Sequence, residues 1–225
     1  MKKKIIILSG GMDSTTLLWD LYMKYGKENL MALSFNYSSK HNQYELPMAI
    51  KTCAKLGVEH ETFNLEDIFK YFNSALLQGG NEIPEGHYSQ ETMKQTIVPY
   101  RNGILLSIAI GLAESIGADT VFYGAHGGDH YIYEDTRPEF IQAFSLASYL
   151  GTINKIKVEA PYTNMTKIEI LKKGLEIGVN YSLTHTCYKP NEKGESCGKC
   201  GACIERLEAF EKNKIKDPLK YYNEI

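Results

Sequence analysis

The feature that most constrains the fold is a polar, glycine-bearing string between two apolar segments: Ser9-Gly10-Gly11-Met12-Asp13-Ser14-Thr15-Thr16. Residues 4–8, before it, are rich in β-branched side chains, as in a buried strand, and residues 15–25, after it, have the apolar spacing of a helix. Two glycines between a strand and a helix can aim consecutive backbone N–H groups at an anion. The hydroxyls of Ser14 and Thr15 add donors at the positive end of the helix. The string therefore predicts a phosphate-binding loop.

A Gly-Gly turn can also be a plain connection between a strand and a helix, without a binding role. For the glycine pair alone that interpretation stays open. The loop has no Lys at the position where the P-loop of kinases and GTPases carries one. Transfer of a terminal phosphate is therefore not the chemistry that the loop predicts.

Strand-like and helix-like segments alternate along most of the chain. After the first strand and helix we expect strands over residues 30–36, 59–65, 120–123 and 155–159, and helices over residues 46–56, 102–116, 139–149 and 167–177. This alternation predicts a doubly wound parallel sheet of the α/β class. Residues 79–98 interrupt it with polar and glycine-bearing sequence, and they fit either a substrate-covering lid or a plain insertion.

Composition narrows the class of partner. Of 225 residues 43% are hydrophobic and 23% charged, which is typical of a globular protein, and the net charge of -2 disfavours extensive binding to a nucleic-acid backbone. The first apolar run is too short for a signal peptide, and no stretch is long enough to span a bilayer. We expect a cytoplasmic protein that acts on a small molecule, with no nucleic-acid or membrane partner.

Four of the five cysteines lie close together near the C-terminus: Cys187, Cys197, Cys200 and Cys203. Nine, two and two residues separate them, and four thiolates satisfy a tetrahedral structural zinc site with no open position. Chance clustering of buried cysteines and a redox pair are the alternatives. The fifth, Cys53, lies in a helix-like stretch and is expected to be a packed side chain. We therefore expect residues 1–180 to form the nucleotide-binding domain and residues 181–225 to form a small zinc-binding region with a helix near residues 204–212.

The string Ser9 to Ser14 resembles the signature of the ATP pyrophosphatase family, whose members cleave ATP between the α and β phosphates and share an adenine nucleotide alpha hydrolase-like fold. Further strings resemble one branch of it, the 7-cyano-7-deazaguanine synthases. They are Tyr37-Ser38-Ser39-Lys40-His41 followed by Glu45-Leu46, Val98-Pro99-Tyr100-Arg101-Asn102-Gly103, Gly124-Ala125-His126-Gly127-Gly128-Asp129 continuing to Tyr133, Arg137 and Phe140, and Thr186-Cys187-Tyr188 with the segment from Cys197 to Cys203 and Arg206. Three departures stand out: family members carry Gly-Gln in place of Ser38-Ser39 and Pro in place of Glu134, and the spacing from His41 to Glu45 is longer than their commoner form.

The resemblance implies roles for individual residues, with ATP, Mg²⁺ and Zn²⁺ as cofactors. The nucleotide would be held by Leu8, Ser9, Gly10, Gly11, Met12, Asp13, Ser14, Thr15 and Thr16, and Asp13 would help to hold Mg²⁺. Catalytic roles fall to Arg101, His126, Asp129 and Lys167. Substrate binding falls to Tyr37, Lys40, His41, Tyr133 and Arg137. Taken without the family, Arg101 also fits a surface ion pair, His126 a buried histidine bonded to backbone, and Lys167 a solvated helix face.

The resemblance also implies a reaction: ATP-dependent conversion of 7-carboxy-7-deazaguanine and ammonia to 7-cyano-7-deazaguanine, by a homodimeric ligase. Adenylation suits a carboxylate substrate, because a carboxylate resists nucleophiles until one oxygen is part of a good leaving group. Two enzymatic alternatives stay open: a relative that passes the activated base to another amine, and another amidating or thiolating member of the superfamily. A binding module that has lost catalysis is the alternative from a different class.

Overall fold

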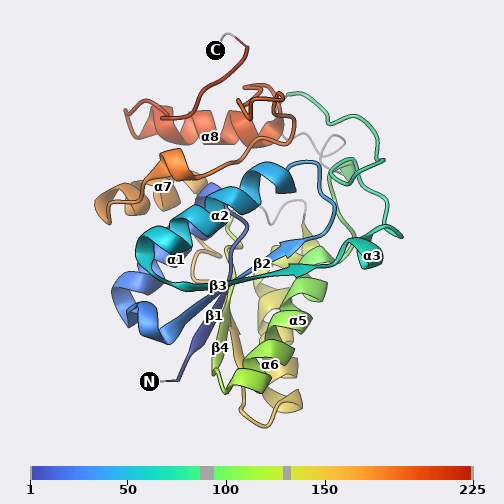
Figure 1. The fold of residues 1–225 in the computed structure, drawn as a ribbon, viewed down its shortest axis with the longest axis vertical. Coiled ribbons are helices and arrows are strands. Elements are labelled where there is room, and N and C mark those ends of the chain that lie inside the picture. Colours follow the sequence, from blue (N-terminus) through green and yellow to red (C-terminus); the bar gives the residue numbers. More distant parts are fainter. Residues whose placement is uncertain (1, 87–93, 129–132, 224–225) are drawn as a thin grey trace.

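Five parallel strands form one sheet in the order β3-β2-β1-β4-β5 (Figure 1). The structure is a computed structural model, and it describes residues 2–86, 94–128 and 133–223. The strands are β1 (Lys4–Ile7), β2 (Leu30–Asn36), β3 (Glu59–Asn64), β4 (Thr120–Phe122) and β5 (Lys157–Glu159). The central strand β1 pairs with β2 on one side and with β4 on the other, so the strand order reverses there. The predicted doubly wound parallel sheet is confirmed.

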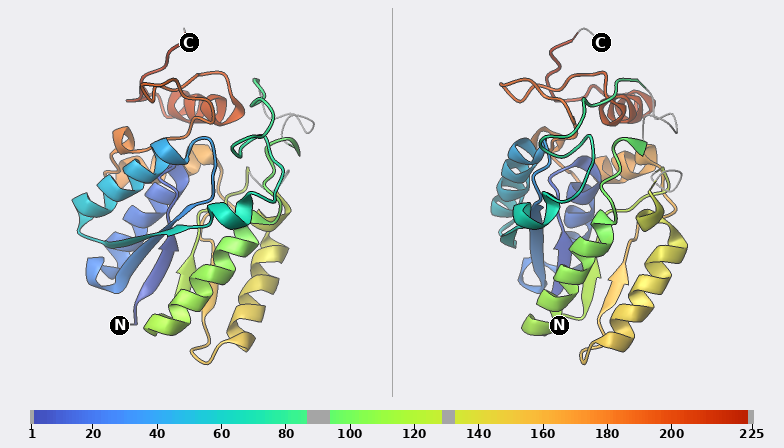
Figure 2. Two further views of the ribbon diagram at one scale, coloured as in Figure 1. Left: turned by 45° about the vertical axis from the view of Figure 1, so that its right-hand side comes forward. Right: turned by 90° about the vertical axis from the view of Figure 1, so that its right-hand side faces the viewer.

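Helices cover both faces of the sheet, because alternate side chains of a strand point to opposite faces. Ile5 and Ile6 are both fully buried, yet they belong to separate hydrophobic clusters. The cluster of Ile6 includes side chains from α1 (Met12–Tyr25), α2 (Asn42–Leu56) and α7 (Lys167–Glu176). The cluster of Ile5 includes side chains from α5 (Arg101–Ile116) and α6 (Pro138–Gly151). Figure 2 shows these two helical layers on either side of the strands.

The expected helices and strands are present, with ends that differ by a few residues. Four short elements were not predicted: α3 (Glu66–Phe69) and the 3-10 helices η1 (Lys27–Asn29), η3 (Glu134–Thr136) and η4 (Tyr181–Leu183). Each is about one turn long, too short for an apolar period to appear in the sequence.

The C-terminal region lies over the carboxyl ends of the strands (Figures 1 and 2). Its helix α8 (Gly201–Lys212) shares a hydrophobic cluster with α1 and α7, in which Met12, Leu171 and Phe210 are buried. Gly86 donates a backbone hydrogen bond to the carbonyl of Lys199, so the start of the polar segment 79–98 also contacts this region. Residues 87–93, which the lid hypothesis needs, lie outside the described residues. Within the described ranges, no helix has the length and apolar character needed to cross a membrane.

Candidate active site

The loop between β1 and α1 is held by its own serines. Ser9 and Ser14 lie with their hydroxyl oxygens 3.0 Å apart, and Gly11 N–H donates to Ser9 Oγ at 3.1 Å. Gly10 has a φ of 95°, and a Cβ there would lie 2.1 Å from the carbonyl oxygen of Glu45. Only glycine fits this combination of left-handed backbone and close approach. The N-terminus of α1 has no side-chain cap, so its amides remain available to an anion.

Asp13 is the centre of a charged cluster at the mouth of this loop. Its Oδ2 lies 3.6 Å from His126 Nε2 and 3.5 Å from Lys167 Nζ. Lys167 also contacts Glu205 of α8, with 2.8 Å between Nζ and Oε2. Asp13 Oδ1 is buried and has no hydrogen-bond partner among the described residues. An oxygen in that state is suited to a cation that is bound together with phosphate.

Local sequence places Lys167 and Arg101 at the starts of their helices. Thr166 and Glu169 form a capping box, in which each side chain receives the backbone N–H of the other, and α7 therefore begins at Lys167. Before α5, Tyr100 has a φ of 51°, a strained conformation for a non-glycine residue. Arg101 follows it and donates to Tyr37 Oη at 3.3 Å. The strain is consistent with a requirement that Arg101 face the cavity.

One cavity brings together groups from the ends of β1, β2 and β4 and from the C-terminal region. The sequence-predicted residues that line it are Ser9, Gly11, Met12, Asp13, Ser14, Tyr37, His41, Arg101, His126, Tyr133 and Lys167. This is the carboxyl edge of the sheet at the point where the strand order reverses, where open α/β sheets bind ligands.

Other predicted residues do not line the cavity. Leu8 is fully buried, and Thr15 is buried with no partner for its Oγ1 among residues 2–86, 94–128 and 133–223. Thr16 bonds Tyr181 at 2.8 Å. Gly10 lies behind the loop surface, where its carbonyl accepts from His185 N–H at 3.0 Å.

Two predicted substrate residues point elsewhere. Lys40 Nζ donates to the carbonyls of Gly80 and Asn81, and Arg137 pairs with Glu134. Asp129 lies outside the described residues.

Glu45, Thr186 and Tyr188 also line the cavity, and they lie in strings that resemble the family, but no site role was predicted for them. The place of Glu45 four residues after His41 on one helix face was a signal for it. Two supporting contacts were not predicted: Asp135 bonds the N-terminus of α5, and Glu205 bonds Lys167. Both depend on the tertiary fold.

Burial changes the acid–base state of two facing side chains. Burial raises the pKa of Glu45 to about 8, with Arg101 opposing that shift and Asp13 adding to it. Burial and the charges of Arg101 and His185 together lower the pKa of His41 to about 3. Near neutral pH the imidazole is therefore neutral, and the carboxyl group is predominantly protonated.

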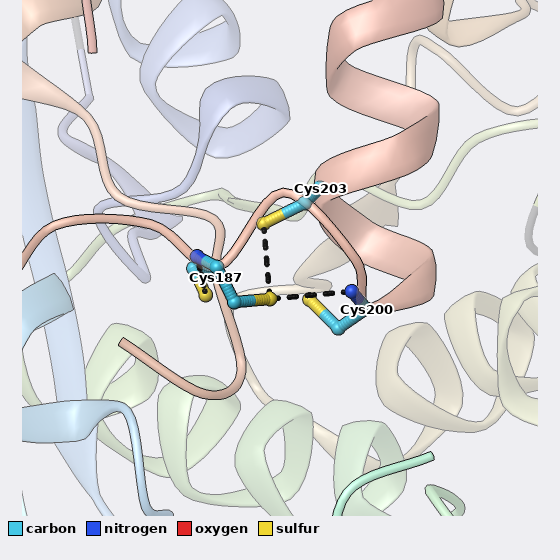
Figure 3. Close-up of side chains that lie close together, drawn as sticks. Cys187, Cys200 and Cys203 are labelled. Atoms are coloured by element: carbon cyan, nitrogen blue, oxygen red, sulfur yellow. Dashed lines mark hydrogen bonds between the residues drawn. The ribbon is translucent and has the colours of Figure 1, made fainter. Parts of the chain in front are cut away.

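The four C-terminal cysteines are all buried, and their sulfurs all lie within 4.8 Å of one another. Figure 3 shows the side chains of Cys187, Cys200 and Cys203 converging. The sulfurs of Cys197 and Cys203 are 3.8 Å apart. This matches the separation of about 3.8 Å expected between two thiolates of a tetrahedral ion with metal–sulfur bonds of about 2.3 Å. Backbone amides of Lys199 and Cys200 donate to Cys197 Sγ. Such donors favour the thiolate form.

The cysteine cluster is tied to the cavity through one short segment. Arg206 of α8 is buried and bonds Asp217 through two nitrogens, at 2.6 and 3.0 Å. It also donates to the hydroxyls of Thr184 and Thr186. Because Thr186 lines the cavity and precedes Cys187, the order of the cysteine cluster is linked to that of the cavity wall.

Residues 3–214 match the family described as "Queuosine biosynthesis protein QueC". A relative named 7-cyano-7-deazaguanine synthase from Hahella chejuensis is 50% identical over 97% of this chain and 93% of its own length. A relative of the same name from Caldicellulosiruptor bescii is 48% identical over 99% of both chains.

Two solved structures share the fold at low identity. A U34-tRNA thiolase, NcsA from Methanococcus maripaludis with its [4Fe-4S] cluster, has a TM-score of 0.51 at 18% identity, covering 94% of this chain and 67% of its own. The NMN synthetase from Francisella tularensis also has a TM-score of 0.51, at 15% identity, covering 96% of this chain and 78% of its own. At these identities the similarity establishes the fold alone.

Proposed function

The chain belongs to the queuosine biosynthesis protein QueC family, and from that membership we propose that it is an ATP-dependent ligase that converts 7-carboxy-7-deazaguanine and ammonia to 7-cyano-7-deazaguanine. The substrate carboxylate attacks the α phosphate of ATP and releases pyrophosphate. Ammonia then displaces AMP to give the amide. A second adenylation, on the amide oxygen, allows loss of that oxygen with AMP and leaves the nitrile.

The observation that carries this proposal is the loop of Ser9 to Ser14 at the carboxyl edge of the sheet, in a chain about half identical to synthases over its whole length. The uncapped amides of α1 and the Ser14 hydroxyl would hold the phosphates. Lys167 and Arg101 bring positive charge to the same cavity. Catalysis then consists mainly of positioning the reactants and neutralising phosphate charge.

Asp13 would hold Mg²⁺, because its buried Oδ1 has no other partner among the described residues and a carboxylate oxygen is a preferred ligand of that ion. When bound, the ion neutralises phosphate charge. Lys167 would bind phosphate oxygens from the other side, since it lies 3.5 Å from Asp13 and reaches the cavity. His126 would orient Asp13 from its buried position.

Tyr37, His41, Arg101 and Tyr133 would surround the base at the far side of the cavity, where aromatic rings and the guanidinium are in contact. Lys40 and Arg137 could contribute only if their present partners were exchanged for substrate. A catalytic role for Asp129, which follows the glycines after His126, is proposed from the family resemblance alone.

We assign residues 181–225 as a metal-binding region and zinc as its ion. All four sulfurs lie within 4.8 Å of one another, which suits a single ion. A four-iron cluster would place each thiolate on a separate iron and spread the sulfurs further apart. Four thiolates leave the ion no open position, so its role is structural. Residues 1–180 then supply the nucleotide-binding domain.

The protein is further proposed to act in the cytoplasm as a homodimer without nucleic acid. Five unpaired cysteines suit a reducing compartment, and a net charge of -2 offers no general attraction for phosphate backbones. The homodimer rests on the family resemblance, and sedimentation of the purified protein tests it.

Incubation with 7-carboxy-7-deazaguanine, ammonium and Mg·ATP, followed by mass spectrometry, tests the proposed function. The nitrile is the expected product, with the amide as a transient species. If the amide accumulated without nitrile, or if the carboxylate joined another amine instead, the chain would be a conjugating relative of the synthases.

A further inference from the structure

Glu45 and His41 form a carboxyl–imidazole pair that faces the cavity. Both lie at the start of α2, and Glu45 Oε2 is 3.6 Å from His41 Nε2. Their side chains are 12% and 4% exposed, respectively, and both line the cavity. A Cβ placed on Gly11 would lie 3.5 Å from Glu45 Oε1, so the carboxyl group lies beside the nucleotide loop.

The place of Glu45 is unusual for a carboxyl group. An ionised carboxylate beside bound phosphates is repelled by them unless a cation lies between the two, because like charges repel. Three charged or titratable side chains from three elements act on it: His41 of α2, Asp13 of α1 and Arg101 of α5. Burial raises the pKa of Glu45 to about 8, with Arg101 opposing and Asp13 adding to that shift. A group of this kind can both take and release a proton near neutral pH.

His41 is held so that one ring nitrogen faces Glu45. Its ring packs on Tyr188 at 5.2 Å between centroids, and the charges of Arg101 and His185 add to the burial that lowers the pKa of His41 to about 3. Its Nδ1 is buried without a hydrogen-bond partner among the described residues. The imidazole is therefore neutral, and its Nε2 lies 3.6 Å from the Glu45 carboxyl group without adding charge.

We propose that Glu45 is the general base that takes one proton from nitrogen in amide formation and one in nitrile formation, and that His41 is a positioning residue for it. This inference rests on the proposed function. In the first step the lone pair of ammonia forms the N–C bond, a proton passes from nitrogen to the Glu45 carboxylate, and the C–O bond breaks with its electrons leaving on AMP.

The second step follows adenylation of the amide oxygen. After one proton has gone to water, the remaining N–H proton passes to Glu45 and the electrons of that bond form the third C–N bond of the nitrile. The C–O bond breaks at the same time, and AMP again carries its electrons away. Each proton on Glu45 returns to solvent before the next turnover.

Glu45→Gln separates this role from substrate activation. Without ammonia, the exchange of labelled pyrophosphate into ATP, dependent on 7-carboxy-7-deazaguanine, measures adenylation alone. We expect this exchange to stay within about three-fold of wild type, because no proton moves in that step. Amide formation should fall by about 100-fold or more, the range expected for loss of a general base. Glu45→Asp, which keeps a carboxyl group, should recover part of that loss.

The matched control is Glu176→Gln, which makes the same chemical change at an exposed position at the end of α7. Rates are compared at fixed free ammonia, so that ionisation of ammonium does not enter. The rate of amide formation by wild type should rise with pH as Glu45 loses its proton. The rate for Glu45→Gln should not change with pH. His41→Gln should displace the midpoint of the wild-type profile.

Two results would overturn the inference: equal loss of exchange and amide formation in Glu45→Gln, which would make Glu45 a nucleotide or metal ligand, or unchanged amide formation. If the proposed function were wrong, wild type itself would show neither pyrophosphate exchange dependent on 7-carboxy-7-deazaguanine nor nitrile formation. The inference about Glu45 would then be wrong as well.

Discussion

At the scale of single residues, Gly10 is where the nucleotide loop and α2 meet. Its φ of 95° and the Glu45 carbonyl, 2.1 Å from any added Cβ, exclude a side chain. Gly10→Ala should lower the free energy of unfolding by at least ~1–2 kcal/mol, the cost of a left-handed backbone for an L-residue, and should weaken ATP binding. Urea denaturation and ATP titration measure the two effects.

Gly111 supplies the matched control for Gly10. It lies inside α5 with no atom within 4 Å of an added Cβ. Gly111→Ala should raise the free energy of unfolding by ~0.5–1 kcal/mol, because alanine is the better helix former. If Gly10→Ala were as harmless as Gly111→Ala, the close packing of the loop on α2 would be wrong.

Glu45 also predicts a pH dependence of stability that needs no substrate. Its pKa is raised to about 8 from an ordinary 4.5, so the folded protein binds a proton that the unfolded chain has released between those values. Stability conferred at this position is therefore lost as pH rises from about 4.5 to about 8. Glu45→Gln never ionises. Its free energy of unfolding should therefore rise relative to that of wild type over this pH range, by more than ~1 kcal/mol at about pH 8.5. If the difference in free energy of unfolding between Glu45→Gln and wild type were the same at about pH 5 and about pH 8.5, the raised pKa of Glu45 would be wrong.

Ser38 shows how a departure from the family pattern is accommodated. Family members resembling this chain carry Gly at the position of Ser38, and here Ser38 has a φ of 60°. Glycine at this position suits a left-handed turn, which serine adopts at some cost in free energy.

At the scale of elements, the longer strands and helices could be predicted from the sequence, because each is long enough for its period to appear. The loop of Ser9 to Ser14 and the cysteine cluster could be predicted because both are local strings. The contact of Lys167 with Glu205 and the cavity wall formed by Thr186 and Tyr188 were not predicted. Those depend on how α8 folds back over the sheet, which no local pattern encodes.

The helix α8 provides the test of the metal centre. Cys200 is its N-cap residue and Cys203 lies in its first turn. Cys200→Ser should remove the zinc, lower the unfolding temperature, and reduce activity through disorder of the segment that contains Thr186. Zinc content should be about one ion per chain in wild type. Cys53→Ala, a change at the buried cysteine of α2, should keep its zinc. If Cys200→Ser kept both zinc and stability yet lost turnover, the cluster would have a chemical role.

At the scale of the whole molecule, the loop of Ser9 to Ser14, the cavity-lining side chains and the four-cysteine region meet at one edge of the sheet. We propose that this edge activates the substrate twice by adenylation. Nucleotides and base are quantified in one reaction to test this. We expect two AMP and two pyrophosphate for each nitrile formed, one of each per activation, with no ADP. Release of ADP and free phosphate, or nitrile formation with a single AMP, would show that double adenylation is wrong.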